Sequence, residues 1–141
     1  MSIVFTNGCL DILTPAHFNL LLLCRRWAGS DGQVIVAIDS DTKIKKDKGE
    51  DRPIFSEIER HDALLSLKNG LDPIVDVVYK FDTNEQLHEL ISQIKPDLLI
   101  KGADWRGNTI GSDIAKKVLY YDLDSRFSTT KIIEKVLNKK K

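Results

Sequence analysis

Short apolar runs alternate with amphipathic stretches along the chain, and this alternation restricts the fold more than any other feature of the sequence. The run 33–38 (QVIVAI) is apolar almost without interruption, which is typical of a strand buried on both faces of a parallel sheet. Strands that alternate with helices predict an α/β fold in which helices cover both faces of one five-stranded parallel sheet. The strands are expected at 3–5, 33–38, 74–81, 98–101 and 118–123.

Helix boundaries are marked between these runs. Thr14 is a good N-cap, and Pro15 suits the first helical position because no N–H is needed there. The segments 56–59 (SEIE) and 83–86 (TNEQ) both match the capping-box pattern. The polar stretch 39–55 has no periodicity and is predicted to be a loop. The helices are expected at 15–28, from 56 to about 68, at 84–94, around 112–117 and from about 128 onward.

The composition predicts one globular domain, 1–141, with no nucleic acid or membrane partner. The 21 basic and 21 acidic side chains give a formal net charge of zero, so the whole molecule offers no electrostatic attraction for either. The longest apolar run, 20–24, is far too short to cross a bilayer. No signal-peptide pattern opens the sequence, and Cys9 and Cys24 make no disulfide framework, so a cytoplasmic location is expected. Any phosphate ligand must therefore meet a local cluster of positive charge.

Each polar loop that carries candidate functional residues follows a predicted strand. In open parallel sheets, ligands bind outside the carboxyl ends of the strands, at the point where the strand order reverses. We therefore expect these loops to converge on one binding site. They are 6–14, 39–52, 101–108 and 124–130.

The first loop leads into the start of a helix, where phosphates bind well. His17 falls at the third helical position, beside unpaired backbone N–H groups that carry a partial positive charge. An imidazole there can donate a hydrogen bond to a phosphate oxygen. Gly8 allows close approach of the backbone or a positive φ, although an ordinary strand-to-helix turn would use it as well. Asp11 could bind a hydroxylated substrate or simply stabilise the turn.

The second loop carries an excess of positive charge. Its cations, Lys43, Lys45, Lys46, Lys48 and Arg52, outnumber the acids Asp47, Glu50 and Asp51. A flexible basic loop can close over a triphosphate and supply charge as the transition state forms, although charge runs are more often solvated surfaces. Arg60 could join this cluster, or it could pair with Glu57 or Glu59.

The last two loops offer further polar groups. The segment 101–107 (KGADWRG) ends a buried strand, and Trp105 in it could cover a sugar or a base or cap the core. Ser128, Thr129 and Thr130 open the final helix, where hydroxyls and backbone N–H groups can hold a phosphate or merely cap the helix. No zinc-ligand spacing or pair of carboxylates in one loop predicts a metal site made by the chain itself. The chemistry on offer is positioning and charge stabilisation of phosphates.

Together these motifs resemble the cytidylyltransferase-like nucleotidyltransferases over nearly the whole chain. The segment 5–13 (FTNGCLDIL) resembles the opening of the bacterial heptose 1-phosphate adenylyltransferases, and 14–17 (TPAH) lies where the superfamily carries its (H/T)xGH signature. The glycerol 3-phosphate cytidylyltransferases are a near relative that 104–107 and 128–132 resemble as much. Further segments similar to the heptose enzymes are 40–41, 48–49, 52–54, 101–104 and 127–130.

The resemblance implies a single Rossmann-like domain and a reaction. A sugar-phosphate oxygen attacks the α-phosphorus of ATP or CTP, Mg²⁺ assists and pyrophosphate leaves. His17, assisted by Thr14, would stabilise the α-phosphate, and Lys48, with Lys46 as a second candidate, would neutralise the phosphates. The nucleotide-binding residues would be Thr6, Asn7, Gly8, Arg60, Lys101, Gly102, Asp104, Ser128, Thr129 and Thr130. The substrate-side candidates are Asp11, Arg52 and Trp105.

Two departures from the family pattern leave the substrate open. The heptose and glycerol enzymes usually carry His where this chain has Thr14, and Ala16 replaces the usual glycine. Three functions are therefore considered: an adenylyltransferase acting on a heptose 1-phosphate or a similar sugar phosphate, a cytidylyltransferase acting on glycerol 3-phosphate or another small alcohol phosphate, and a nucleotide-binding module that has lost catalysis. The resemblance also makes a homodimer plausible.

Overall fold

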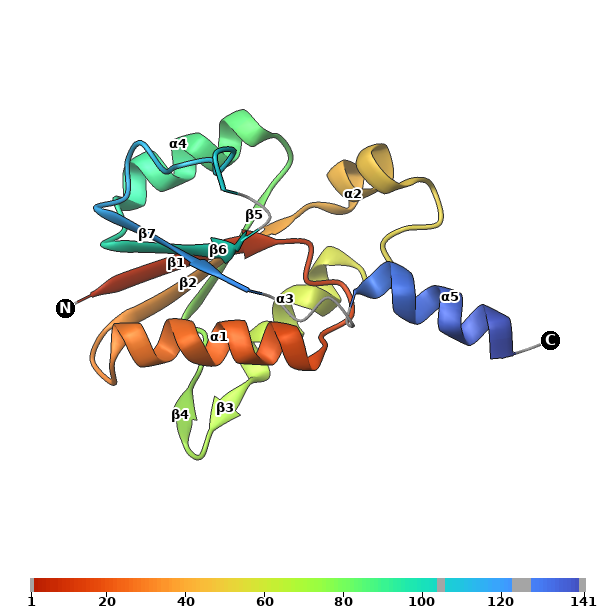
Figure 1. The fold of residues 1–141 in the computed structure, drawn as a ribbon, viewed down its shortest axis with the longest axis horizontal. Coiled ribbons are helices and arrows are strands. Elements are labelled where there is room, and N and C mark those ends of the chain that lie inside the picture. Colours follow the sequence, from red (N-terminus) through yellow and green to blue (C-terminus); the bar gives the residue numbers. More distant parts are fainter. Residues whose placement is uncertain (1, 104–105, 123–127, 140–141) are drawn as a thin grey trace.

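The computed structural model describes residues 2–103, 106–122 and 128–139, and its centre is a five-stranded sheet (Figure 1). All strand pairs in this sheet are parallel, as the sequence predicts, and the strand order is β5-β2-β1-β6-β7. The chain therefore begins in the middle of the sheet, builds outward to β5 and then returns to the other side of β1. The strands are β1 (Ile3–Gly8), β2 (Gln33–Asp39), β5 (Val77–Phe81), β6 (Leu98–Gly102) and β7 (Lys117–Tyr121).

The sheet is buried on both faces, which explains the apolar run in β2. Val34 and Val36 belong to one buried cluster, whereas Ile35 and Ala37 belong to the other. Successive residues of a strand point to opposite faces, so a continuous apolar run fits a strand that is covered twice. The expectation of helices on both faces is confirmed.

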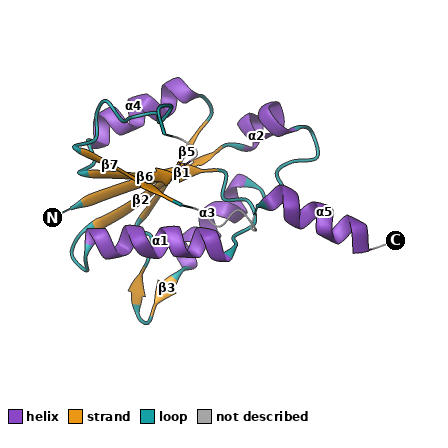
Figure 2. Cartoon of the chain, in the orientation of Figure 1, coloured by secondary structure: helices purple, strands orange, loops and turns teal. Residues whose placement is uncertain are grey.

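Helices α1 and α3 contribute to one of these clusters and α4 contributes to the other, on the opposite face of the sheet (Figure 2). Helix α5 extends beyond the body, and none of its residues is buried (Figure 1). A small two-stranded antiparallel sheet of β3 (Lys68–Asn69) and β4 (Asp72–Pro73) precedes β5. The helices are α1 (Pro15–Ala28), α2 (Asp41–Lys48), α3 (Glu57–Ser66), α4 (Asn84–Ile94) and α5 (Thr129–Lys139).

Two predictions of local structure are wrong. The segment 39–55 contains helix α2 rather than only a loop, because Ser40 Oγ caps it by accepting a bond of 3.1 Å from Lys43 N–H, and Ile44 is buried beneath it. The segment 112–117 forms turns instead of a helix, and β7 already begins at Lys117. The third predicted strand, 74–81, is shortened to β5.

The predicted helix starts agree better with the structure. Thr14 is the N-cap of α1, and Ser56 and Glu59 form both halves of a capping box at the start of α3. Thr83 caps α4 by accepting from Gln86 N–H, while the Gln86 side chain accepts from Asp82 N–H. In the described part of the chain, no helix has the length and apolar character required to span a membrane.

Candidate active site

A cavity of about 1040 Å³ opens at the carboxyl ends of the strands. It lies beside the end of β1, where the strand order reverses. Strand β1 pairs with β2 on one side and with β6 on the other. This is the edge at which parallel α/β sheets bind ligands. The structure gathers around it ten of the predicted site residues: Thr6, Asn7, Gly8, His17, Lys48, Lys101, Gly102, Ser128, Thr129 and Thr130.

Two hydrogen bonds join β1 to β6 at the base of the cavity. Thr6 Oγ1 donates to the carbonyl of Ile100 over 2.7 Å, and Lys101 Nζ donates to the carbonyl of Asn7 over 3.0 Å. Thr6 and Lys101 are both buried, with exposed fractions of 1% and 7%. Lys101 thus brings a positive charge to the bottom of the cavity and fixes the backbone of the predicted glycine turn.

In the turn after β1, the residue with a positive φ is not the glycine. Gly8 is the last residue of β1 and lines the cavity, but the left-handed residue is Leu10, with φ of 49°. An added Cβ at Gly8 would meet only Leu10 Cγ, at 4.0 Å. The absent side chain at Gly8 therefore leaves open space for a ligand, which favours close approach over turn geometry as its purpose.

His17 is held at the start of α1 by the residue that caps the helix. Thr14 N–H donates to His17 Nδ1 over 3.0 Å, and Thr14 Oγ1 lies 3.3 Å from the same nitrogen. Because an amide N–H can only donate, Nδ1 accepts this bond, and neutral His17 carries its proton on Nε2. Thr14 is buried and does not line the cavity, so its contact to His17 orients the ring.

The surroundings of His17 favour this neutral form. Burial lowers the pKa of His17 most strongly, the backbone of Ile12 opposes that shift, and the charge of Lys48 adds to it. The net result is a pKa below the ordinary value of histidine. His17 can therefore donate from Nε2 near neutral pH without first taking up a proton.

Helix α2 explains why only some of the basic residues reach the cavity. Lys43, Ile44, Asp47 and Lys48 line it, whereas Lys46 is exposed on another side of the helix. In a helix, residues three and four apart lie on the same face, so only one set of side chains can point to the cavity. A loop would not impose this selection. The structure thus brings Lys48 to the site and does not bring Lys46.

Lys48 lies close to the turn after β1. Burial and the carboxylate of Asp39 raise the pKa of the Cys9 thiol, and Lys48 counteracts this rise through its charge and a hydrogen bond. The charge of the same lysine also lowers the pKa of His17, so its ammonium group lies near both the β1 turn and the start of α1.

Asp11 and Arg52 contact each other in the structure, outside the lining of the cavity. Asp11 accepts two backbone bonds of 2.8 Å, from Ile54 N–H and Phe55 N–H, and its side chain is 1% exposed. Arg52 Nε lies 3.8 Å from Asp11, and Arg52 Nη1 donates to Thr130 Oγ1 over 3.5 Å. Neither Asp11 nor Arg52 lines the cavity, and together they connect the β1–α1 turn with α5.

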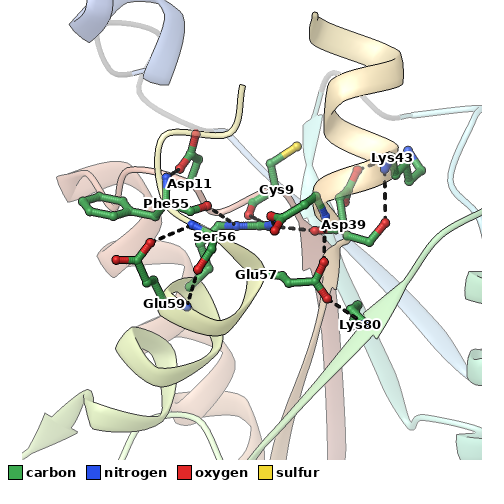
Figure 3. A network of polar contacts seen from close by, with 12 residues as sticks. Cys9, Asp11, Asp39, Lys43, Phe55, Ser56, Glu57, Glu59 and Lys80 are labelled. Atoms are coloured by element: carbon green, nitrogen blue, oxygen red, sulfur yellow. Dashed lines mark hydrogen bonds and ion pairs between the residues drawn. The ribbon is translucent and has the colours of Figure 1, made fainter. Parts of the chain in front are cut away.

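Arg60 is placed away from the cavity and donates to the backbone carbonyls of Cys9, Asp39 and Phe55, three of the residues labelled in Figure 3. Its side chain is 0% exposed. Nη1 donates to the carbonyls of Cys9 and Asp39, over 2.9 and 2.7 Å. Nε donates to the carbonyl of Phe55 over 3.0 Å, and Nη2 donates to Asp41 Oδ1 over 2.9 Å. Arg60 therefore joins the ends of β1 and β2 to the start of α2, which gives no support to the predicted phosphate contact.

The start of α5 forms the remaining wall. Ser128 Oγ accepts a bond of 3.0 Å from Lys131 N–H, and Thr129 and Thr130 form the first turn. Asp104 and Trp105, predicted for the nucleotide and the substrate, lie outside the described residues.

Several lining residues were not predicted from the sequence. They come from α2, from the ends of β2 and β5, from the start of α4 and from the segment after β6. Only their positions at the carboxyl ends of strands could have indicated them. They include Asp39, Ile44, Phe81, Asn84, Leu87, Asn108 and Ile110.

Comparison with known proteins gives one family and a consistent set of relatives. The model of the family described as cytidylyltransferase-like matches residues 5–135. The bifunctional protein HldE of Campylobacter jejuni subsp. doylei is 44% identical over 139 residues, which are 98% of this chain and 28% of that protein. HldE of Helicobacter pylori is 40% identical over 136 residues, 95% of this chain and 27% of that protein. The chain thus spans little more than a quarter of the length of these relatives.

A solved structure confirms the fold. The lipopolysaccharide core biosynthesis protein from Thermoplasma volcanium GSS1 superposes with a TM-score of 0.67 and is 20% identical. The match covers 88% of this chain and 99% of that one.

Proposed function

Because the chain belongs to the cytidylyltransferase-like family, we propose that it transfers the nucleoside monophosphate of ATP to a sugar phosphate of the heptose 1-phosphate type. The observation that carries this proposal is the single cavity that holds His17, Lys48, Lys101 and the first turn of α5. Cations and helix starts gathered at the carboxyl edge of a parallel sheet suit a triphosphate. The likeness of 5–17 to heptose 1-phosphate adenylyltransferases supports the choice of acceptor and of ATP.

In the proposed reaction, a phosphate oxygen of the acceptor attacks the α-phosphorus of ATP. A bond from that oxygen to phosphorus forms, the bond from the α-phosphorus to the bridging oxygen breaks, and pyrophosphate leaves. His17 Nε2–H donates to an oxygen of the α-phosphate as negative charge develops there. Lys48 neutralises the same region from α2. Such donors accelerate the reaction by stabilising charge in place, so no covalent enzyme intermediate is needed.

Mg²⁺ fits this site as a partner of the phosphates. Among the described residues, no three His, Cys, Asp or Glu side chains gather as a ligand set. Mg²⁺ needs no such cage, because it usually binds one or two carboxylates together with substrate phosphates and water. When bound, the ion would offset charge on the triphosphate. Dimerisation and a cytoplasmic location stay predictions of the sequence.

Pyrophosphate release tests the proposal. The chain is incubated with ATP or CTP and with a heptose 1-phosphate, mannose 1-phosphate or glycerol 3-phosphate, with a minus-acceptor control. We expect the fastest release from ATP with the heptose 1-phosphate. Strict dependence on CTP and glycerol 3-phosphate would establish the cytidylyltransferase alternative instead. Tight nucleotide binding without turnover on any acceptor would favour a module that has lost catalysis.

A further inference from the structure

The cavity is larger than one small molecule requires and its two sides differ in chemistry. Its volume of about 1040 Å³ lies at the upper end of the ~300–1,000 Å³ of typical ligand pockets, which leaves room for two reactants. Lys101 lies on β6, whereas Phe81 ends β5 at the far edge of the sheet, three strands away. At roughly 4.8 Å per strand, these positions are about 14 Å apart across the sheet.

The β5 side of the cavity contains a lysine already paired with acids. Lys43 Nζ lies 3.1 Å from Asp39 Oδ2 and 2.7 Å from Asp47 Oδ2, and it stands over the ring of Phe81 at 5.8 Å from the ring centre (Figure 3 shows the Asp39 contact). One ammonium between two carboxylates leaves this side negative. A triphosphate is repelled from it and is directed toward Lys48 and Lys101.

The same groups retain capacity to bind a neutral, hydroxylated molecule. An ammonium group has three N–H donors, and within the described residues Lys43 uses two of them on carboxylates. Asp39 Oδ1 has no hydrogen-bond partner in the described part of the chain and is not among its buried unpaired atoms. The exposed side chain of Asn84 lines the cavity beside them and can both donate and accept. Sugar hydroxyls also do both, so they match this mixture of groups.

The backbone holds these groups in place before any ligand arrives. Arg60 Nη1 fixes the Asp39 carbonyl at 2.7 Å, and Ser40 N–H donates to the Phe81 carbonyl over 2.9 Å. Ser40 Oγ then caps α2 at Lys43 N–H. A site whose groups are already oriented loses less conformational entropy on binding.

We propose that Asp39, Lys43 and Asn84 form the subsite that binds the hydroxyl groups of the sugar acceptor. This assignment rests on the proposed function and extends it by separating the acceptor from the nucleotide. The triphosphate occupies the β1–β6 side, and the sugar ring of the acceptor occupies the β5 side, over the apolar side chain of Leu87.

The first test compares how two variants change KM for the sugar phosphate and KM for ATP. Asp39→Asn keeps the shape of the side chain but removes its charge, and Asn84→Ala changes an exposed residue. Each should raise KM for the heptose 1-phosphate by about tenfold or more, while KM for ATP changes less than about twofold. Asp62→Asn, on an exposed part of α3 outside the cavity, is the matched control and should change neither. Equal effects on both substrates, or none, would overturn the assignment.

A second measurement does not require turnover and separates this proposal from the proposed function. Amide resonances of the wild type are followed by NMR during titration with the heptose 1-phosphate and, separately, with inorganic phosphate. We expect the resonances of Asp39, Lys43 and Asn84 to shift with the sugar phosphate and not with inorganic phosphate. Shifts confined to the β1–β6 side, or identical shifts with both ligands, would refute the subsite. Absence of pyrophosphate release with these shifts present would refute only the proposed function.

Discussion

Replacing Arg60 with lysine tests whether this buried residue stabilises the frame of the site or contacts phosphate. The sequence predicts a phosphate contact, whereas the structure gives its guanidinium four hydrogen bonds, to three carbonyls and to Asp41. Lysine keeps the charge but has one nitrogen, which cannot reach all the acceptors that lie around different edges of the planar guanidinium. The variant therefore changes geometry without removing the charge.

The expected cost follows from the bonds lost. Lysine can retain about one of the four contacts, and the carbonyls of Cys9, Asp39 and Phe55 are then left wholly or partly unpaired. Each buried acceptor left unpaired typically costs about 1–3 kcal/mol, so these carbonyls together should cost roughly 3–5 kcal/mol. Set against a domain stability of roughly 5–15 kcal/mol, this is a large fraction. At an m-value of about 2 kcal/mol/M, the urea midpoint should fall by roughly 2 M.

Urea unfolding followed by circular dichroism measures this change, with nucleotide binding measured by calorimetry at a temperature where Arg60→Lys remains folded. Arg26→Lys is the matched control, because Arg26 is exposed on α1, and its midpoint should not change. An Arg60→Lys variant with the wild-type midpoint but much weaker ATP binding would show that the side chain meets phosphate after all, and the structural reasoning would be refuted.

Four further outcomes are expected. His17→Ala should lower kcat by about two orders of magnitude or more, because one transition-state donor is lost. The free energy of unfolding should change by only about 1 kcal/mol, and an unchanged kcat would contradict the proposed role of His17. NMR titration of His17 in the free protein should give a midpoint below the ordinary histidine value of about 6.5 and the Nε2–H form, because burial lowers its pKa; a raised midpoint would contradict this. Lys48→Ala should reduce kcat more than nucleotide affinity, and an equal loss of both would indicate a static binding role. Asp11→Asn should lower the free energy of unfolding by about 1–3 kcal/mol in urea unfolding, because one of two backbone N–H groups loses its acceptor; loss of acceptor affinity at full stability would instead support the predicted substrate contact.

The parts of the fold that the sequence predicts well are those with local signals. The bounds 15–28 of α1 follow from a capping threonine, a proline at the first position and Gly29 after the last turn. The parallel sheet follows from the apolar run 33–38, which only a doubly covered strand would carry.

Helix α2 was missed because it has almost no apolar side to detect. Ile44 is its single buried residue, so no periodic pattern emerges from eight mostly charged residues. The capping serine, Ser40, was the available signal, together with charges four apart in Asp39, Lys43 and Asp47. Recognising the helix would have divided the lysines by face and separated Lys48 from Lys46.

Arg60 shows a limit of a different kind. A capping box and an amphipathic pattern place it on α3, but nothing local indicates that the carbonyl ends of β1 and β2 meet at its position. Those carbonyls converge only because β1 and β2 are adjacent in the sheet and end at the same edge. Contacts of this kind depend on tertiary arrangement, so composition and spacing cannot distinguish a buried arginine from one that binds phosphate.

The Arg60 contacts also bear on how this site works with Thr14, at the position where the heptose and glycerol enzymes usually carry His. Thr14 does not line the cavity, and it orients His17 through its backbone N–H, which any residue except proline supplies. In the proposed reaction, the positive charge near the α-phosphate then comes from Lys48 and Lys101, which lie on separate elements of the cavity wall. Lys48 is placed by α2, and Arg60 ties the start of α2 to the ends of β1 and β2. If Lys48 acts as proposed, a change at Arg60 should affect catalysis through the position of Lys48. At constant folded fraction, it should lower kcat while leaving the tautomer of His17 unchanged.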